Sequence, residues 1–101
     1  MITPEDVREC LLDVLDPELM MDVVNLGLIY DIQVQDGTRV EIVMTLTTMG
    51  CPAGDSIRQE MIEKVQELPG VQDVQVAVTF DPPWSKEMMS DEARTIFRYL
   101  F

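Results

Sequence analysis

The sequence predicts an α+β fold, a two-layer sandwich in which helices cover one face of a small mixed three-stranded sheet. The hydrophobic period changes along the chain in the order helix, strand, strand, helix, strand, helix. An Asp-Gly pair separates the first two strand patterns and indicates a hairpin. A helical pattern separates the second and third strands, which therefore run parallel with a right-handed crossover. With 101 residues and no linker or repeat, the chain forms a single domain, 1–101.

The first helix begins at a Thr3-Pro4 pair, where threonine caps the helix and proline takes the first helical position. Asp6, three residues after Thr3, completes the capping signature of a helix start. Apolar residues then follow helical spacing until Asp16-Pro17 ends the helix, namely Val7, Cys10, Leu11, Val14 and Leu15. Cys10 lies in the middle of this stripe, which predicts a small buried apolar residue rather than a reactive one.

The two strands of the hairpin alternate apolar and polar residues. The apolar set of the first is Leu28, Tyr30, Ile32 and Val34, and that of the second is Val40, Ile42, Met44 and Leu46. Only a loop with an odd number of residues keeps both sets on one face. We therefore predict a three-residue loop, Gln35–Gly37, that places Tyr30 opposite Ile42 and Gly37 in a left-handed bulge position.

The remaining elements have equally local signals. A helix from about Pro52 to Leu68 has the apolar stripe Ile57, Met61, Val65 and Leu68, and Pro69-Gly70 stops it. A third strand follows with Val74, Val76, Val78 and Phe80, before Asp81-Pro82-Pro83 breaks it. Ser90 can cap a last helix, whose inward residues are predicted to be Ala93, Ile96, Phe97 and Leu100.

Three segments are predicted to meet at one end of the sheet. Extending the hairpin register sets Thr45 opposite Gly27 and Thr47 opposite Asn25, and the parallel third strand ends at the same edge. The residues expected to converge are Asp16, Glu18, Asn25, Thr45, Thr47, Cys51 and Trp84. Each also has a purely structural interpretation: Asp16 ends a helix, Glu18 is solvated, the threonines favour strands, and Trp84 covers the core.

Cys51 stands out in this set because it precedes a proline at a helix start. The positive end of the helix dipole favours a thiolate there, although Asp55 opposes it. We expect an accessible, moderately nucleophilic thiol.

Composition excludes several classes of function. Nineteen acidic residues against seven basic ones give a net charge of −12, which argues against nucleic acid or a membrane surface as partner. The absence of histidine excludes Ser-His-Asp and Cys-His catalysis and imidazole metal sites. Two cysteines cannot supply the four ligands of a permanent cluster, so we expect no stably bound cofactor. No secretion signal or membrane-length apolar run is seen, which predicts a cytoplasmic protein.

Five co-linear motifs, "DPEL", "VNLGLIYDI", "MTLTTMGCP", "LPGVQDVQV" and "DPPW…MS", make the chain resemble the small SufT/PaaD-like family over nearly its whole length. The resemblance implies the fold of iron–sulfur cluster assembly domains and a non-catalytic factor that helps clusters reach recipient apoproteins. It implies site residues at Asp16, Pro17, Glu18, Asn25, Leu26, Gly27, Thr45, Thr47, Cys51, Pro52 and Trp84, with Cys51 as the thiol related to cluster or iron handling. Many relatives have glycine where this chain has Met20, and the chain lacks the cysteine-bearing tail of PaaD proteins, which favours the short general form.

Three readings follow from this resemblance and from the residues themselves. The first is an assembly factor that holds iron or a cluster transiently through Cys51, with the assembly machinery, recipient apoproteins or a second copy in a homodimer as partners. The second is a thiol-dependent enzyme with Cys51 as nucleophile. The third is an adaptor that only binds a partner, in which Cys51 is incidental and the methionine-rich loops make the contact.

Overall fold

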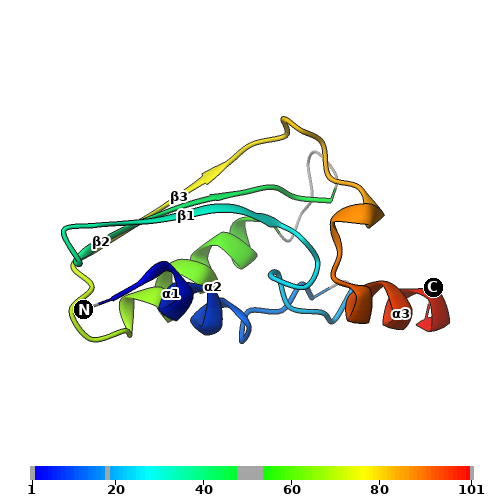
Figure 1. The fold of residues 1–101 in the computed structure, drawn as a ribbon, viewed down its shortest axis with the longest axis horizontal. Helices are drawn as coiled ribbons and strands as arrows, with labels where there is room; N and C mark the ends of the chain where they lie inside the picture. The colour runs from blue at the N-terminus through cyan, green and yellow to red at the C-terminus, as the bar shows by residue number, and fades with distance from the viewer. Residues whose placement is uncertain (1, 18, 48–53, 101) are drawn as a thin grey trace.

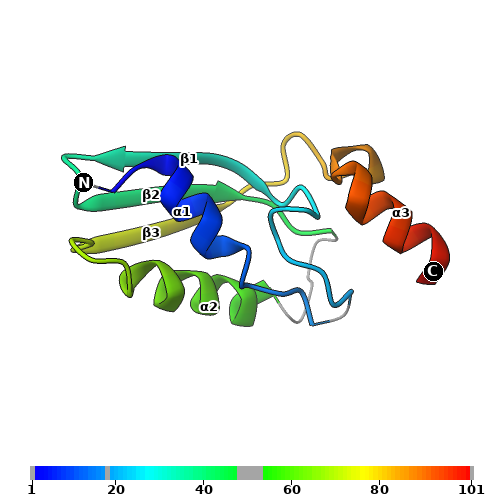
Figure 2. The ribbon, with the colours of Figure 1, turned by 60° about the horizontal axis from the view of Figure 1, so that its bottom comes forward.

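The computed structural model describes residues 2–17, 19–47 and 54–100 and has the predicted α+β architecture. Its elements are α1 (Pro4–Leu11), β1 (Ile29–Gln35), β2 (Arg39–Met44), α2 (Gly54–Gln66), β3 (Asp73–Val78), the short 3₁₀ helix η1 (Lys86–Met88) and α3 (Asp91–Leu100). The sheet has the order β1-β2-β3, and α1 and α2 cover one of its faces (Figure 1). α3 lies beyond the end of the sheet and lengthens the molecule to 41 × 26 × 21 Å (Figure 2).

The start of α1 is as predicted, whereas its end is not. The Thr3 side chain accepts a hydrogen bond from the Asp6 amide, and the Asp6 carboxylate accepts one from the Thr3 amide, which completes the capping box. The helix then ends at Leu11, five residues before Asp16. The chain leaves it because Val14 turns to accept a hydrogen bond from the Val23 amide at 3.0 Å. Leu15 consequently lies outside the helix and is 43% exposed.

The β1–β2 hairpin has the predicted odd loop, one residue later than predicted. Gln35 pairs with Arg39, which leaves Asp36–Thr38 unpaired, and Gly37 is left-handed at φ +69 as expected. Ile42 therefore lies opposite Ile32, and the predicted Tyr30–Ile42 pair is wrong. Within the sheet, the pairing register of β1 with β2 shifts by one residue between Ile29 and Asp31, where β1 contains one extra residue.

β3 pairs with β2 in parallel, as predicted from the intervening helix. α2 begins at Gly54 and ends at Gln66, and its buried residues Ile57, Met61 and Val65 are those predicted; Leu68 lies past the helix and is half-buried. The core between the helices and the sheet is built mainly from Val7, Leu11, Val23, Leu26, Leu28, Val40, Ile42, Met44, Val74 and Val76.

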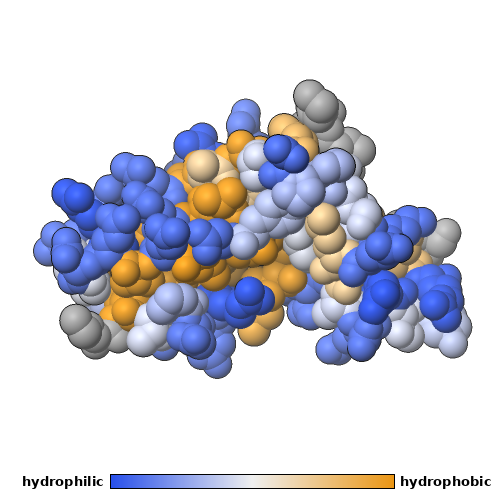
Figure 3. Space-filling view, turned by 45° about the horizontal axis from the view of Figure 1, so that its top comes forward, coloured by the Kyte–Doolittle hydropathy of each residue, from blue (hydrophilic) through white to orange (hydrophobic). Residues whose placement is uncertain are grey.

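In the part of the chain that the structure describes, no helix covers the outer face of the sheet (Figure 1). Figure 3 looks onto this side and shows an apolar area over the middle of the molecule with hydrophilic residues around it. Val43 is half-buried, and its β3 neighbour Ala77 is exposed. The flanking positions on this face are polar, among them Asp31, Gln33, Glu41, Asp73 and Gln75. The sheet thus has one face that packs on the core and one face that is largely exposed to solvent.

α3 begins as predicted, since Ser90 Oγ accepts a hydrogen bond from the Ala93 amide at 3.1 Å. Ala93 is buried and Phe97 half-buried, but Ile96 is 40% exposed, so its predicted inward position is wrong. The reason is that α3 packs on loops at the end of the sheet, not on the sheet itself, and only a narrow strip of the helix is covered.

Candidate functional site

Residues 14–17 and 19–28 form hydrogen-bonded loop segments at the end of the sheet and carry the first group of predicted site residues. Asp16 is 3% exposed, and one of its carboxylate oxygens accepts a hydrogen bond from the Leu19 amide at 3.2 Å. Its backbone amide donates to Met21 O, and its carbonyl accepts from the Met20 amide. Asp16 thus organises the turn that follows it instead of ending a helix.

Met20 occupies the left-handed region at φ +57 with its side chain 70% exposed. This conformation favours glycine, the residue that the family resemblance implied for this position.

Asn25 is held by Asp22 and joins the loop to the C-terminal segment. Its backbone amide and its side-chain amide donate to the two carboxylate oxygens of Asp22, at 2.8 and 2.6 Å. Its carbonyl accepts a hydrogen bond from the Ser90 amide at 2.9 Å. The side chain of Asn25 is therefore engaged within the loop, and its backbone fixes the start of α3.

Gly27 and Trp84 both lie where residues 25–27 pack against the C-terminal segment. The indole Nε1 of Trp84 donates to Leu26 O at 2.7 Å. Gly27 is left-handed at φ +78, and a Cβ atom there would lie 2.2 Å from Met88 O. The glycine is thus required twice, by its backbone conformation and by the close approach of η1. Residues 25–27 thus form the seat on which residues 84–90 pack, through Trp84, Met88 and Ser90.

Thr45 and Thr47 follow β2 at this end of the sheet. Thr45 is fully buried. Its amide donates a hydrogen bond to Leu28 O at 2.8 Å, whereas the sequence predicted that Thr45 lies opposite Gly27. The later loop moves the register by two residues and the extra residue in β1 moves it back by one, which leaves this displacement of one residue. Thr47 is half-buried. Leu46, between them, packs against Gly54 at the start of α2, where a Cβ atom would lie 2.8 Å from Leu46 Cδ1.

Cys51, Pro52 and Glu18 lie outside the described residues. The ends that flank residues 48–53 are described, and they place this segment between the exit of β2 and the start of α2. The expected convergence of Cys51 with Asp16 and Trp84 stays a prediction.

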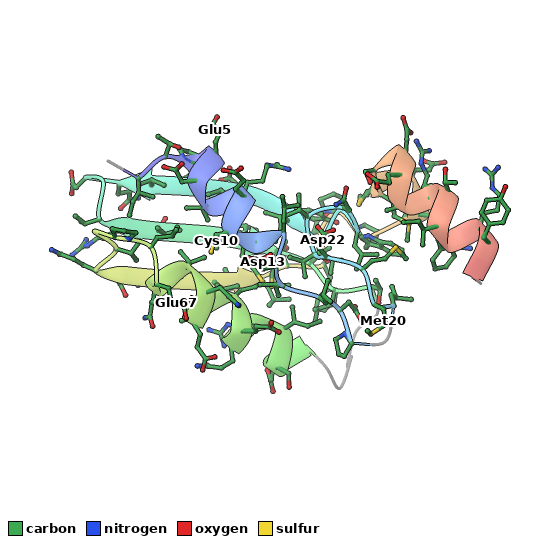
Figure 4. The ribbon with its side chains drawn as sticks, turned by 90° about the horizontal axis from the view of Figure 1, so that it is seen from below. Glu5, Cys10, Asp13, Met20, Asp22 and Glu67 are labelled. Atoms are coloured by element: carbon green, nitrogen blue, oxygen red, sulfur yellow. The ribbon has the colours of Figure 1, made fainter. Side chains whose placement is uncertain are left out.

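Cys10 lies between α1 and α2 (Figure 4) and is half-buried, not fully buried as predicted. Its thiol donates a hydrogen bond to Lys64 O at 3.2 Å. Burial raises the pKa of the Cys10 thiol, and the carboxylates of Asp13 and Glu67 raise it further against an opposing effect of Lys64. A thiol of this kind is mostly protonated at neutral pH and makes a poor nucleophile or metal ligand.

The described ranges, which leave out Cys51, contain no cluster of three acidic or cysteine side chains able to hold a metal ion. Likewise, no helix in those ranges is long and apolar enough to cross a membrane.

Two residues with structural roles at this end were missed from the sequence. Tyr30, predicted as part of the apolar alternation, sits at the register shift of β1 and donates from its hydroxyl to Pro82 O at 2.8 Å. Met88 Sδ lies 3.4 Å from the same hydroxyl. The bulge has no clear sequence signal, but a tyrosine within an otherwise aliphatic strand set indicates a side chain with a polar partner.

The whole arrangement is shared with known proteins. A family model described as iron–sulfur cluster assembly protein matches residues 4–78. The chain is 46% identical to the Fe-S protein maturation auxiliary factor SufT of Staphylococcus aureus, over 80% of this chain and 92% of that protein. It is 41% identical to the Fe-S protein maturation auxiliary factor YitW of Bacillus subtilis, over 89% of this chain and 88% of that protein.

A solved structure of a domain of unknown function (DUF59) from Bacillus anthracis has the same fold. Its TM-score is 0.90 with 36% identity, covering 94% of this chain and 91% of that one. Since the family model spans α1 through β3 and the relatives match along nearly their full lengths, this chain belongs to the iron–sulfur cluster assembly protein family of SufT-like factors.

Proposed function

We propose that this protein is an auxiliary factor in iron–sulfur cluster assembly that assists delivery or maturation of clusters in recipient apoproteins. The observation that carries the proposal is the family membership, together with a likeness to maturation auxiliary factors that extends over most of both chains. The partners are then the assembly machinery and the recipient apoproteins.

Cys51 is the thiol that handles the cluster or iron in this proposal. The chain has two cysteines. Cys10 is engaged with Lys64 O, and its pKa is raised by burial, so it is unsuited to the task. In sequence, Cys51 lies between β2, which ends at Met44, and α2, which begins at Gly54. A thiol close to a helix start is favoured as a thiolate.

Cluster or iron binding is transient in this proposal because one chain offers too few soft ligands. With Cys51 as the working thiol and no histidine in the chain, an iron–sulfur cluster lacks three of its usual four thiolate ligands. A second copy, a recipient protein or a small thiol has to supply the others. The cluster is thus cargo that passes to an acceptor offering a complete ligand set.

The role is non-catalytic in this proposal. A thiol-dependent enzyme needs a base or a strongly lowered thiol pKa, and the chain has no histidine to act as that base. The names of the relatives, which are auxiliary factors, support the same assignment.

The test compares Cys51→Ser with Cys10→Ala in cells that carry only the variant protein. Under iron limitation, the activity of an iron–sulfur enzyme should fall with Cys51→Ser and should stay near that of the parent with Cys10→Ala. The melting temperature of each purified variant controls for unfolding. Full enzyme activity in Cys51→Ser cells would refute the role of the thiol and favour the adaptor reading. Anaerobic reconstitution followed by transfer to an apoprotein tests the cargo step directly.

A further inference from the structure

A basic hollow lies between η1 and α3, away from the sheet. It has a volume of about 350 Å³ and is lined by Lys86, Met89, Arg94, Phe97 and Arg98. Met89 is 3% exposed and Phe97 half-buried, so both form an apolar floor. The three cationic side chains are exposed and form the rim. Figures 1 and 2 show α3 projecting past the end of the sheet, so the rim is open to a partner.

The charge of this hollow is opposite to that of the chain as a whole. The chain has seven basic residues and a net charge of −12, yet three of the seven line this one hollow. Arg94 and Arg98 are four residues apart on one side of α3, a spacing at which like charges repel. Asp91, which pairs with Arg94, relieves part of that repulsion, and a bound anion would relieve more of it.

Local contacts hold two of the three cations at the hollow. The Arg94 guanidinium pairs with the carboxylate of Asp91. The Lys86 ammonium lies 4.9 Å from the centre of the Phe97 ring, in a cation–π contact. These contacts reduce the side-chain freedom that a ligand would otherwise have to restrict. At physiological ionic strength, charges more than about 8 Å away are largely screened, so the distant acidic residues weaken the attraction of an anion to the hollow only a little. Glu87, Asp91 and Glu92 belong to the same segment but do not line the hollow.

We propose that this hollow is a docking site for a short acidic segment of a partner protein, in which an apolar side chain lies beside carboxylates. The carboxylates meet the rim, and the apolar side chain contacts Phe97 and Met89. The size of the hollow suits one or two side chains of such a segment. The inference rests on the proposed function, since delivery requires contact with recipient or assembly proteins.

The experiment is a ¹⁵N-edited NMR titration of the full chain with the peptide acetyl-Gly-Asp-Leu-Glu-Asp-Leu-Gly-amide. The amide signals of residues 86–98 should shift. Replacing both leucines of the peptide with serine should weaken binding, and so should added salt. Arg98→Glu should raise the Kd about fivefold or more, because it removes an attraction and adds a repulsion.

Arg39→Glu is the matched control, since it changes the charge equally at an exposed arginine at the start of β2. It should leave the Kd nearly unchanged. Arg98→Gln, which keeps a good helix former, should weaken binding to a smaller extent and guards against fraying of α3. Equal affinities of the Arg98→Glu and Arg39→Glu proteins, or shifts centred away from residues 86–98, would overturn the proposal. These results concern the docking site alone, whereas the Cys51→Ser cells concern the proposed function alone.

Discussion

Replacing Gly27 with alanine is the sharpest test of how the C-terminal segment is attached. An added Cβ would lie 2.2 Å from Met88 O and 2.6 Å from Met88 C, distances that real Cβ atoms do not adopt. The left-handed backbone at φ +78 adds a cost of about 1–2 kcal/mol for alanine. Overlap with the backbone of η1 adds about 1–3 kcal/mol. We expect Gly27→Ala to lower the free energy of unfolding by about 2–5 kcal/mol.

Gly70→Ala provides the matched control. Gly70 is also left-handed, at φ +91, but the nearest atom to an added Cβ is Ile2 Cδ1 at 3.8 Å. It therefore carries the backbone cost without the overlap. Both substitutions also restrict the unfolded chain equally, so that effect cancels in the comparison. The difference between the variants should be about 1–3 kcal/mol, or at least about 5 °C in Tm.

Thermal unfolding followed by circular dichroism measures this difference. If η1 and α3 instead swing away to avoid the added methyl group, NMR shifts in Gly27→Ala should be concentrated in residues 84–98. Equal Tm values for the two alanine variants, with the signals of residues 84–98 unmoved, would refute the close approach of η1 to Gly27.

Three further predictions concern single contacts. In Cys51→Ser protein, where Cys10 is the remaining thiol, iodoacetamide should label the native protein slowly, and the rate should rise only at a higher pH than in the denatured protein, because burial raises the pKa of Cys10. Equal native and denatured labelling rates would contradict this. Ser90→Ala should cost about 1 kcal/mol by removing the cap of α3, as measured by urea unfolding, whereas Ser90→Asp should cost little. Trp84→Phe should cost about 1 kcal/mol by leaving Leu26 O without its donor, and an unchanged Tm would show that this hydrogen bond contributes nothing.

Local signals in the sequence predicted most of the fold. The capping box at Thr3 and Asp6, the cap at Ser90 and the left-handed Gly37 each depend on a few neighbouring residues, and each was found. The parallel pairing of β3 followed from topology alone. These features needed no knowledge of distant contacts.

The errors arose where a distant contact overrides a local pattern. α1 ends early because Val14 pairs with Val23, a contact that helical periodicity does not contain. The strand register differs from the prediction because the hairpin loop begins one residue later and because β1 has an extra residue at Tyr30, whose hydroxyl reaches Pro82. α3 leaves the sheet because its seat is the backbone of residues 25–27. The structural reason for Gly27 could therefore not be read from its own motif.

The parallel pairing of β2 with β3 also has a kinetic consequence. The hairpin closes between Gln35 and Arg39, whereas Arg39 must find Asp73 through a long segment that includes α2. Closing a longer loop costs more chain entropy before any pairing compensates it. We expect the β1–β2 hairpin to form before β3 docks. Mutations at the hairpin turn should then mainly slow folding, and mutations in β3 should mainly accelerate unfolding.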